Sequence, residues 1–450
     1  MNHLERFVAV MEYQSVDRVP NWEAGAWGQT RDRWESEGLK PTRLHWQWFP
    51  GEAALGMDPR EFIYFDRSLL PSFEYEVYEE DERTVTFRDS RGMVRRALKE
   101  GTAHGTRASM DHFISFPVKN MADWQEVKKR FDPTSPQRYE PNWQTLRVEG
   151  WRKRQHPLIF GPNTSTSGFY WFARELMGTE GLSYGWYDQP ELLHDMMAFH
   201  ADFLIEAARP ILDQTTVDYV VFAEDLAMKT GPLLSPRTYE TFVFPRLKKV
   251  IDFYKSHGVR YVCIDTDGNP EALIPLMLDA GVDALWPLER AAGQDPLRLR
   301  KEYGRSLRLW GGVDKRVLTQ GPEAIDAHLR SLMPLIEQGG FIPTVDHTVP
   351  PDVTASTGLD AFTQVLEPFV SNRANPLTDS LCREAMRSRP SDSGQRARTA
   401  RPSFTKSCLK NHLPALTSGS RAVHTPSAPF RHSSTRLPPL SMTGSSGYAA

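Results

Sequence analysis

The stretch Val217-Asp218-Tyr219-Val220-Val221-Phe222-Ala223-Glu224-Asp225 sets the pattern that decides the fold. A mostly apolar run ends directly in two carboxylates. The pattern returns at Val259-Arg260-Tyr261-Val262-Cys263-Ile264-Asp265-Thr266-Asp267-Gly268, after an amphipathic segment of helical length at 236–257. Short apolar runs that alternate with helical segments are typical of buried parallel strands covered by helices.

The same alternation continues on both sides of this stretch. Further apolar runs lie at 19–22, 157–161, 282–288, 307–310 and 341–345. Further helices are expected near 120–131, 142–156, 190–214, 270–280, 295–304 and 323–338. The apolar runs amount to at least seven strands, close to the eight of a (β/α)8 barrel. The sequence therefore predicts an α/β fold, and we favour a single (β/α)8 TIM barrel over an open parallel sheet.

Two regions fall outside the repeat. Residues 73–98 alternate apolar and polar side chains around an acidic turn, which predicts an N-terminal β-hairpin as an excursion from the barrel. Beyond about residue 372 apolar periodicity stops and Ser, Arg and Pro dominate. We expect a barrel domain over residues 1–371, with its last helix at 359–370, and a disordered basic Ser/Arg/Pro-rich tail over 372–450.

Charge and cysteine content narrow the classes of function. The 450 residues include 54 Lys+Arg and 57 Asp+Glu, a net charge of −3, so the chain lacks the excess positive charge of a nucleic-acid binder. Only three cysteines occur, Cys263, Cys382 and Cys408, which fits a reducing compartment. No apolar run approaches the roughly 18 residues that a membrane span needs. We expect a cytoplasmic protein with no nucleic-acid and no membrane partner.

Polar side chains follow nearly every predicted strand. They are Glu23, Asn163, Glu224, Asp225, Asp265, Asp267, Glu289, Asp314, Asp346 and His347. In a parallel barrel the carboxyl ends of all strands meet at the rim that carries the active site. The alternative is that single Asp and Asn residues only cap the next helix. The set as a whole, beside the glycines of 267–269 and 311–312, favours a concave, acid-lined site for a small-molecule substrate.

Three of these residues have the chemistry of a metal site. Asp265, Asp267 and His347 form a two-carboxylate, one-histidine set whose donors suit a divalent metal such as Zn, Fe or Mn. The alternative is a capping turn for the two acids and a substrate hydrogen bond for His347. Without a cation, close carboxylates repel and one should have a raised pKa, as a general acid or base needs.

The candidate roles divide accordingly. The catalytic candidates are Glu224, Asp225, Asp265, Asp267 and His347. The substrate-binding candidates are Glu23, Asn163, Glu289, Asp314 and Asp346.

These motifs resemble the uroporphyrinogen decarboxylase superfamily, which also contains cobalamin-dependent methyltransferases. The resemblance is carried by Arg6-Phe7, 16–20, 224–236, 265–269, 280–284, 310–314 and 346–353, and it covers about residues 1–370. It implies one (β/α)8 barrel with its active cleft at the carboxyl ends of the strands.

Two motif positions distinguish the branches of the superfamily. Residues 21–27 lack the arginines with which the decarboxylases bind an acidic porphyrinogen. The zinc motif of the methyltransferases, His-x-Cys-Gly with a later Cys, aligns with 265–268 and with His347. The resemblance thus implies a methyltransferase-like enzyme that moves a methyl group between a small substrate and a corrinoid carried by a partner protein. Glu224, Asp225 or Glu289 would handle protons.

Two other functions remain open. One is decarboxylation of uroporphyrinogen or a related carboxylate in porphyrin biosynthesis, which needs no cofactor. The other is non-catalytic binding of a tetrapyrrole or corrinoid. A homodimer is also left open.

Overall fold

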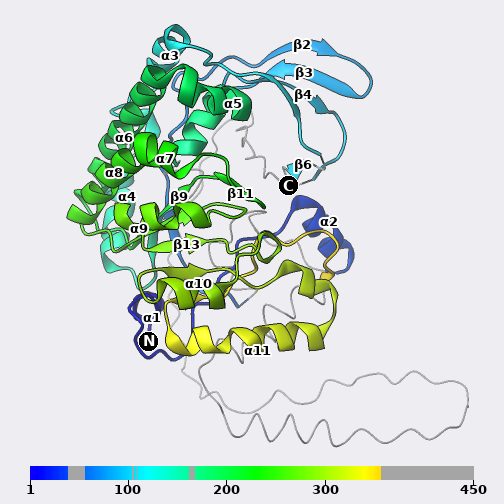
Figure 1. Cartoon of the computed structure of the whole chain (residues 1–450), viewed down its shortest axis with the longest axis vertical. Coiled ribbons are helices and arrows are strands. Elements are labelled where there is room, and N and C mark those ends of the chain that lie inside the picture. The colour runs from blue at the N-terminus through cyan, green and yellow to red at the C-terminus, as the bar shows by residue number, and fades with distance from the viewer. Residues whose placement is uncertain (39–55, 104–105, 108, 162–167, 356–450) are drawn as a thin grey trace, which may run out of the picture. The chain divides into compact units, whose positions relative to one another are not determined.

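A seven-stranded parallel sheet forms the centre of the protein (Figure 1). The computed structural model describes residues 1–38, 56–103, 106–107, 109–161 and 168–355. The strands follow the order β1-β8-β9-β12-β13-β14-β15. Their bounds are β1 (Glu61–Ile63), β8 (Leu158–Phe160), β9 (Tyr219–Ala223), β12 (Tyr261–Asp265), β13 (Ala284–Trp286), β14 (Arg308–Trp310) and β15 (Phe341–Ile342).

The extended segment 19–27 closes the sheet between its first and last strands. On one side the Asp58 N–H donates to the Asn21 carbonyl at 2.9 Å. On the other side the Val349 N–H donates to the Gly25 carbonyl at 3.0 Å. Main-chain bonds on both sides make the sheet a barrel of the (β/α)8 type, which confirms the predicted fold class.

The strand predictions need one correction. Six of the seven predicted apolar runs are barrel strands. The seventh, residues 19–22, is not a strand with a regular hydrogen-bond ladder but part of the extended segment that closes the sheet. The strand that precedes β8 in the sheet is β1, which the sequence analysis did not predict. With three residues, β1 is too short to show a periodic pattern.

The strands are parallel and paired with little offset in register, so their carboxyl ends lie at one rim. Ala223 of β9 lies opposite Asp265 of β12, which lies opposite Trp286 of β13. The polar residues that follow these strands therefore start from the same level of the barrel.

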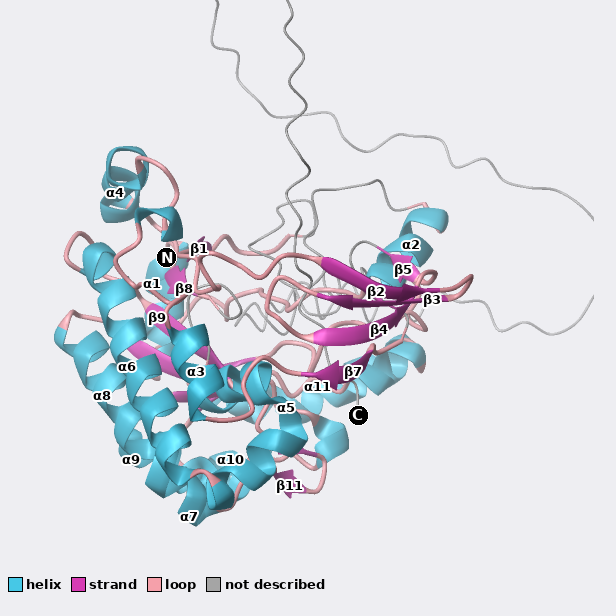
Figure 2. Cartoon of the chain, turned by 90° about the horizontal axis from the view of Figure 1, so that it is seen from above, coloured by secondary structure: helices cyan, strands magenta, loops and turns pink. Residues whose placement is uncertain are grey.

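Helices cover the outside of the sheet, as Figure 2 shows for α6, α8 and α9. Their bounds are α1 (His3–Met11), α2 (Gly28–Ser36), α3 (Met121–Lys128), α4 (Trp143–Lys153), α5 (Phe169–Asp188), α6 (Pro190–Leu212), α7 (Pro236–Thr238), α8 (Phe244–Ser256), α9 (Ile274–Ala280), α10 (Pro296–Tyr303) and α11 (Pro322–Gln338). A π-helical turn, Tyr239–Val243, joins α7 to α8. The predicted helices are confirmed except for their ends.

Helix α5 is the one long helix that the sequence analysis missed. It is buried on several sides, so it lacks the polar stripe of an amphipathic helix. Gly178 interrupts it with φ 75°, and a Cβ there would come within 2.3 Å of the Phe116 ring.

The excursion between β1 and α3 is larger than the predicted two-stranded hairpin. It is a four-stranded antiparallel sheet in the order β2-β3-β4-β7. The bounds are β2 (Glu76–Glu80), β3 (Thr84–Arg88), β4 (Val94–Leu98) and β7 (His112–Ser115). Figure 2 shows this sheet on the side away from α6 and α8. Two small ladders, β5–β6 (Thr102–Ala103 and Thr106–Arg107) and β10–β11 (Ala227–Met228 and Gly231–Pro232), complete the strands.

Aromatic packing fills the amino-terminal end of the barrel. Phe7 of α1 is fully buried, and its ring centroid lies 5.3 Å from Trp22, 5.1 Å from Tyr219 and 5.6 Å from Tyr261. Because this end is filled by large side chains, chemistry is left to the carboxyl ends of the strands.

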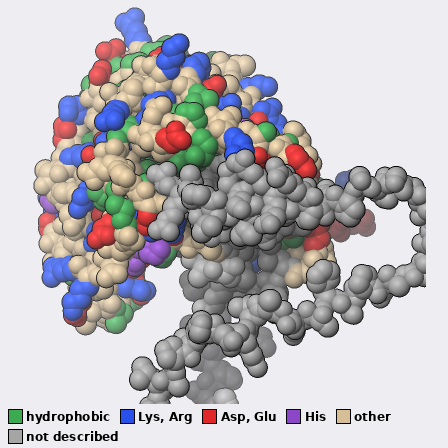
Figure 3. All heavy atoms as spheres, turned by 90° about the horizontal axis from the view of Figure 1, so that it is seen from below, with side chains coloured by type: hydrophobic (Ala, Val, Ile, Leu, Met, Phe, Trp, Pro, Cys, Tyr) green, Lys and Arg blue, Asp and Glu red, His purple; other side chains and the backbone are tan. Residues whose placement is uncertain are grey.

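Some expectations fall on residues outside the described ranges. These are Asn163, the predicted helix at 359–370 and the tail at 372–450, so the boundary at 371 stays a prediction. Among the described helices, none combines the length and apolar character needed to cross a bilayer. On the face shown in Figure 3, acidic and basic side chains of the described residues are interspersed.

Candidate active site

Three side chains from three strand ends converge at the carboxyl rim. Asp267 follows β12, Glu289 follows β13 and His347 follows β15, and one ligand atom of each lies within 4.8 Å of the others. His347 Nε2 and Asp267 Oδ2 are 3.3 Å apart. We refer to Asp267, Glu289 and His347 as the rim triad.

Neighbouring groups hold the rim triad in place. The Gly268 N–H donates to Glu289 Oε2 at 2.9 Å, and Lys315 Nζ donates to Glu289 Oε1 at 3.4 Å. Gly268 has φ 78°, and a Cβ there would lie 2.7 Å from the Ala227 carbonyl oxygen, so only glycine fits this turn. Trp27 stacks on the His347 ring with centroids 5.9 Å apart.

The pKa of His347 is raised above its ordinary value. Burial alone would lower it, but the Asp267 carboxylate, through its charge and its hydrogen bond, outweighs burial. The Asp267 carboxylate thus stabilises the protonated imidazole more than burial destabilises it.

Two further carboxyl groups lie behind the rim triad. Burial, followed by the charge of Asp267, raises the pKa of Asp225 to about 7. Burial, followed by Asp225 and Asp267, raises the pKa of Asp265 well above its usual range. Asp225 also has φ 42°, a strained backbone for a non-glycine residue, and such strain clusters at functional sites.

The predicted metal set and the rim triad share two members. Asp267 and His347 meet as expected, but the third ligand position is held by Glu289, predicted as a substrate-binding residue. Asp265 ends β12 and is 8% exposed, and it is not part of the group that could hold an ion.

Glu224, a catalytic candidate, binds the start of a helix. Its carboxylate accepts the N–H groups of Phe169, Tyr170 and Trp171 at 2.9, 2.7 and 3.4 Å. The side chain is 0% exposed, and burial raises its pKa to about 7 while the three N–H groups lower it. A Cβ at Gly168 would come within 2.1 Å of this carboxyl, so β9 and α5 are fitted closely together.

Asp346 and Asp314, two substrate-binding candidates, also bind backbone. Asp346 is 1% exposed and accepts the N–H groups of Arg290 at 2.8 Å and Lys315 at 2.9 Å. Asp314 caps the 3-10 helix Lys315–Thr319 and pairs with Arg316. Both carboxylates accept hydrogen bonds from backbone N–H groups and so hold loops of the rim in place.

Comparison with known proteins finds one family profile that matches part of the chain. Residues 172–366 match the profile of the family described as Uroporphyrinogen decarboxylase (URO-D). This part of the chain is therefore similar to the uroporphyrinogen decarboxylase family. The matched residues include all seven acids discussed above, from Glu224 to Asp346, and His347.

Two curated proteins are similar to part of the chain. The chain is 26% identical over 167 residues to a uroporphyrinogen decarboxylase of Crocosphaera subtropica, covering 36% of this chain and 44% of the relative. It is 28% identical over 172 residues to one of Nocardia farcinica, covering 37% and 46%. The matched stretch spans less than half the length of these relatives.

Two solved structures show a partial similarity to the chain. A methyltransferase from Methanosarcina mazei is 15% identical, with 82% of this chain and 99% of that chain covered and a TM-score of 0.47. A B12-independent methionine synthase from Shewanella sp. W3-18-1 is 9% identical, with 81% and 99% covered and a TM-score of 0.33.

Sequence reasoning missed three residues near the rim triad. They are Trp27, Arg174 and Lys315. Arg174 Nη1 donates to the Asp225 carbonyl at 3.2 Å, and Lys315 contacts Glu289. Lys315 directly follows the strand-end residue Asp314, so its position carried a signal, whereas Arg174 lies in the helix that was missed.

Glu23 lies deeper in the barrel, below the rim triad. It is 2% exposed, and its Oε2 accepts the Val345 N–H at 2.9 Å. Burial raises the pKa of Glu23 to about 8, so this carboxyl is mostly protonated at neutral pH. It lines a pocket inside the barrel.

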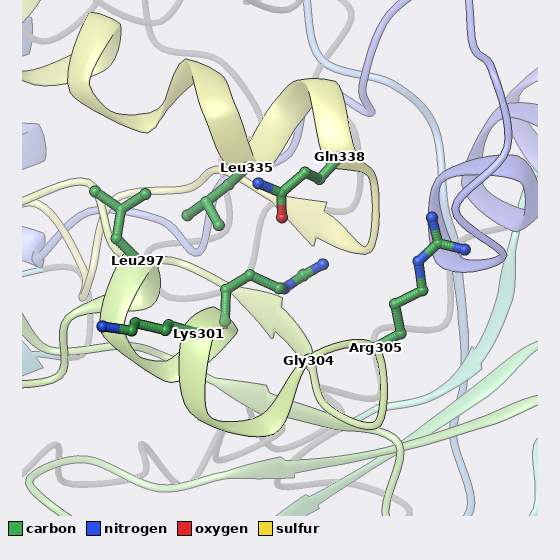
Figure 4. A pocket seen from close by; sticks show the side chains of 7 residues that line it. Leu297, Lys301, Gly304, Arg305, Leu335 and Gln338 are labelled. Carbon is green, nitrogen blue, oxygen red and sulfur yellow. The ribbon is translucent and has the colours of Figure 1, made fainter.

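A second pocket lies at the opposite end of the barrel (Figure 4). It opens between the carboxyl-terminal ends of α10 and α11 and is lined by Lys301, Arg305, Leu335 and Gln338, among others. Figure 4 shows Lys301 and Arg305 on opposite sides, with the Gln338 amide pointing between them. Because helix carboxyl ends precede the amino ends of barrel strands, this pocket is remote from the rim triad.

Proposed function

We propose that this protein transfers a methyl group between a small substrate and a corrinoid carried by a partner protein. The observation that carries the proposal is the rim triad, because its donors come from three strands and lie within 4.8 Å of one another. A decarboxylase that needs no cofactor has no use for such a ligand set.

The donor chemistry of the rim triad fits a divalent metal. One imidazole nitrogen and two carboxylate oxygens suit Zn, Fe or Mn. Asp267, Glu289 and His347 would hold the ion, which would supply a Lewis acid that polarises a substrate atom. Gly268 orients Glu289, and Trp27 fixes the plane of the His347 ring.

Protons are assigned to the carboxyl groups behind the rim triad. Asp225, with a pKa of about 7, can give or accept a proton near neutral pH. Arg174 fixes the backbone of Asp225 through its carbonyl, so the strained residue keeps one orientation. Lys315 adds a positive charge at the rim that offsets the carboxylates during substrate entry.

Decarboxylation of a uroporphyrinogen-type substrate is the second candidate. The names of the curated relatives favour it, and the buried carboxyl groups could accept pyrrole N–H groups. Against it stands the segment 21–27, which has no arginine to pair with the acidic side chains of that substrate.

Metal analysis of the purified protein provides the first test. We expect close to one Zn, Fe or Mn per chain, and loss of that metal in Asp267→Ala. The matched control is Asp314→Ala, which removes the same charge from a capping residue. Wild-type protein with no stoichiometric metal would falsify the metal part of the proposal.

Two activity assays separate the candidates. Incubation with methylated donors and a corrinoid protein should yield methyl-cobalamin, and none from any donor would count against methyl transfer. Incubation with uroporphyrinogen should yield no coproporphyrinogen, and its appearance would establish the second candidate. Binding of a corrinoid or porphyrin with no product in either assay would instead indicate a non-catalytic binder.

A further inference from the structure

Positive charge gathers in the pocket between α10 and α11, at the end of the barrel opposite the rim triad (Figure 4). Its lining includes three cationic side chains, Arg300, Lys301 and Arg305, and no acidic one among the described residues. The volume is about 340 Å³, within the range of roughly 300 to 1,000 Å³ of pockets that hold small molecules. A pocket of this size lined by one sign of charge favours an anionic ligand.

Arg300 is a buried cation that no described carboxylate neutralises. It is 7% exposed, and its Nη1 and Nη2 donate to the carbonyls of Gly339 and Gly340 at 3.0 and 2.9 Å. Its Nε is buried and makes no hydrogen bond to any described residue. Burial lowers the pKa of Arg300, and the charges of Arg305 and Arg308 lower it further. An anion in the adjoining pocket would therefore stabilise the charged guanidinium.

The carboxyl ends of α10 and α11 would by themselves disfavour an anion, because exposed carbonyl groups give a helix end a partial negative charge. At α11 the two carbonyls that follow the helix, Gly339 and Gly340, are bonded to Arg300. At α10 both Arg300 and Lys301 lie in the last turn. Since Arg300 already offsets these helix ends, the charges of Lys301 and Arg305 remain for a ligand.

The charged groups of Lys301 and Arg305 are exposed and form no hydrogen bond or ion pair with any described residue. The Arg305 guanidinium lies 5.0 Å from the centroid of the Tyr13 ring, and the Tyr13 hydroxyl donates to the Arg305 carbonyl at 3.1 Å. Tyr13 thus holds Arg305 beside the pocket. Figure 4 shows Lys301 and Arg305 on opposite sides, with the Gln338 amide between them. An anion placed there would meet positive charge from both sides.

The remaining walls favour a ligand with a carbon body. Leu297 and Leu335 line the pocket beside the cations, and Leu297 is 38% exposed. A carbon body that covers Leu297 would remove apolar surface from water. The charged part of the ligand should match two exposed cations, and a phosphate group carries close to two negative charges at neutral pH.

We propose that this pocket binds a small phosphate monoester, with its phosphate between Lys301 and Arg305 and its carbon body against Leu297 and Leu335. The site is separate from the rim triad and does not depend on the reaction proposed there.

Titration of the full chain with phenyl phosphate tests the proposal. By ligand-observed NMR at low ionic strength, its dissociation constant should be about 1 mM or lower, as expected for a ligand of this size. Benzyl alcohol has a ring without charge and inorganic phosphate has charge without a ring, so each should bind at least about 5-fold more weakly. Added NaCl should weaken the binding, because both cations are exposed. No saturable binding of phenyl phosphate, or equally tight binding of either control compound, overturns the proposal.

Variants of exposed cations locate the phosphate. Lys301→Gln and Arg305→Gln should each weaken phenyl phosphate binding by about 10-fold, the loss expected for one charge-assisted hydrogen bond. The matched control, Arg298→Gln, removes the same charge from α10, but Arg298 pairs with Glu271 and Glu302 and does not line the pocket. Its affinity should stay within about 2-fold of wild type. Equal losses in all three variants would indicate a general effect of surface charge and overturn the proposal.

A variant of the rim triad separates this pocket from the proposed metal site. An anion can also bind a divalent metal, so phenyl phosphate has a second place to bind if the rim triad holds an ion. Asp267→Ala should leave the affinity for phenyl phosphate unchanged. Loss of binding in Asp267→Ala would place the probe at the rim triad and overturn the proposal. Unchanged binding supports the pocket whether or not the protein transfers methyl groups.

Discussion

Glu224 and Asp267 are both carboxylates that follow barrel strands, yet their surroundings differ in kind. Glu224 is fully buried, and its oxygens accept three backbone N–H groups at the start of α5. Asp267 faces His347 and lies with Glu289 in a group that could hold an ion.

The difference shows what separates a structural acid from a functional one at this rim. Both positions satisfy the rule that polar residues after barrel strands lie near the active site. The partner decides the role, since a carboxylate bonded to several backbone groups is committed to the fold, whereas one that faces another side chain is available for a ligand. The predictions below test this distinction, from the largest expected effect to the smallest.

Removal of the Glu224 carboxylate should affect stability most. Glu224→Ala leaves three buried N–H groups without acceptors, so we expect the free energy of unfolding to fall by about 3 kcal/mol or more. Urea denaturation followed by circular dichroism measures it. Glu224→Gln keeps acceptor capacity and should cost less, and a loss below about 1 kcal/mol in the alanine variant would erase the contrast with Asp267.

Removal of the Asp267 carboxylate should affect function and not stability. We expect metal affinity in Asp267→Ala to fall by at least about 10- to 100-fold, the range found even for loss of outer metal partners. The free energy of unfolding should change by less than about 1 kcal/mol, because Asp267 is partly exposed. Equilibrium dialysis against the metal, beside urea denaturation, gives both values. If Asp267→Ala lost as much free energy of unfolding as Glu224→Ala, Asp267 would have a structural role like that of Glu224.

Glu23 is intermediate, with one oxygen bonded to backbone and the other without a partner among the described residues. Its pKa is raised from 4.5 to about 8, so its contribution to stability is present below about pH 4.5 and lost as the pH rises to 8. That loss can reach about 1.4 kcal/mol per pH unit. Glu23→Gln does not titrate, so its stability relative to wild type should increase with pH across this window. The free energy of unfolding of both proteins is measured by urea denaturation at pH 5, 6.5 and 8. A constant difference between Glu23→Gln and wild type would show that the pKa of Glu23 is not raised.

Asp314 should show the smallest effect. Its carboxylate caps a short 3-10 helix, and caps of this kind contribute about 1 kcal/mol. Asp314→Ala should therefore lower the thermal midpoint slightly and leave metal content and probe binding unchanged. Metal loss in this variant would show that the hydrogen-bond partners of a rim acid do not by themselves separate structural from functional acids.

The fold could be predicted from sequence wherever periodicity was long enough to read. Strands such as β9 and β12 are continuous apolar runs, and helices such as α6 and α11 carry clear apolar stripes. Strand β1 has three residues, and helix α5 is buried on most sides, so neither offers a period. Closure by the extended segment 19–27 depends on long-range main-chain bonds that no local pattern encodes.

The sequence predicted which residues lie at the candidate site but not which of them lie next to one another. The strand ends predicted that Asp267, Glu289 and His347 would lie at one rim, and in the structure one ligand atom of each lies within 4.8 Å of the others. The choice of Asp265 as a ligand followed sequence proximity to Asp267, yet Asp265 still belongs to β12 while Asp267 lies in the loop beyond it. The bond from the Gly268 N–H to Glu289 brings the two loops together, and such a contact between loops is not visible in sequence.

Asp346 has a consequence for anyone who redesigns this protein. Its single side chain joins the loop after β13, at Arg290, to the loop after β14, at Lys315. Those loops begin beside Glu289 and Asp314. Because both are bonded to Asp346, replacing either loop alone would remove one of the hydrogen bonds that Asp346 accepts. Libraries that aim at new substrates should exchange both loops together, or keep both and vary the walls of the pocket that Trp286 lines.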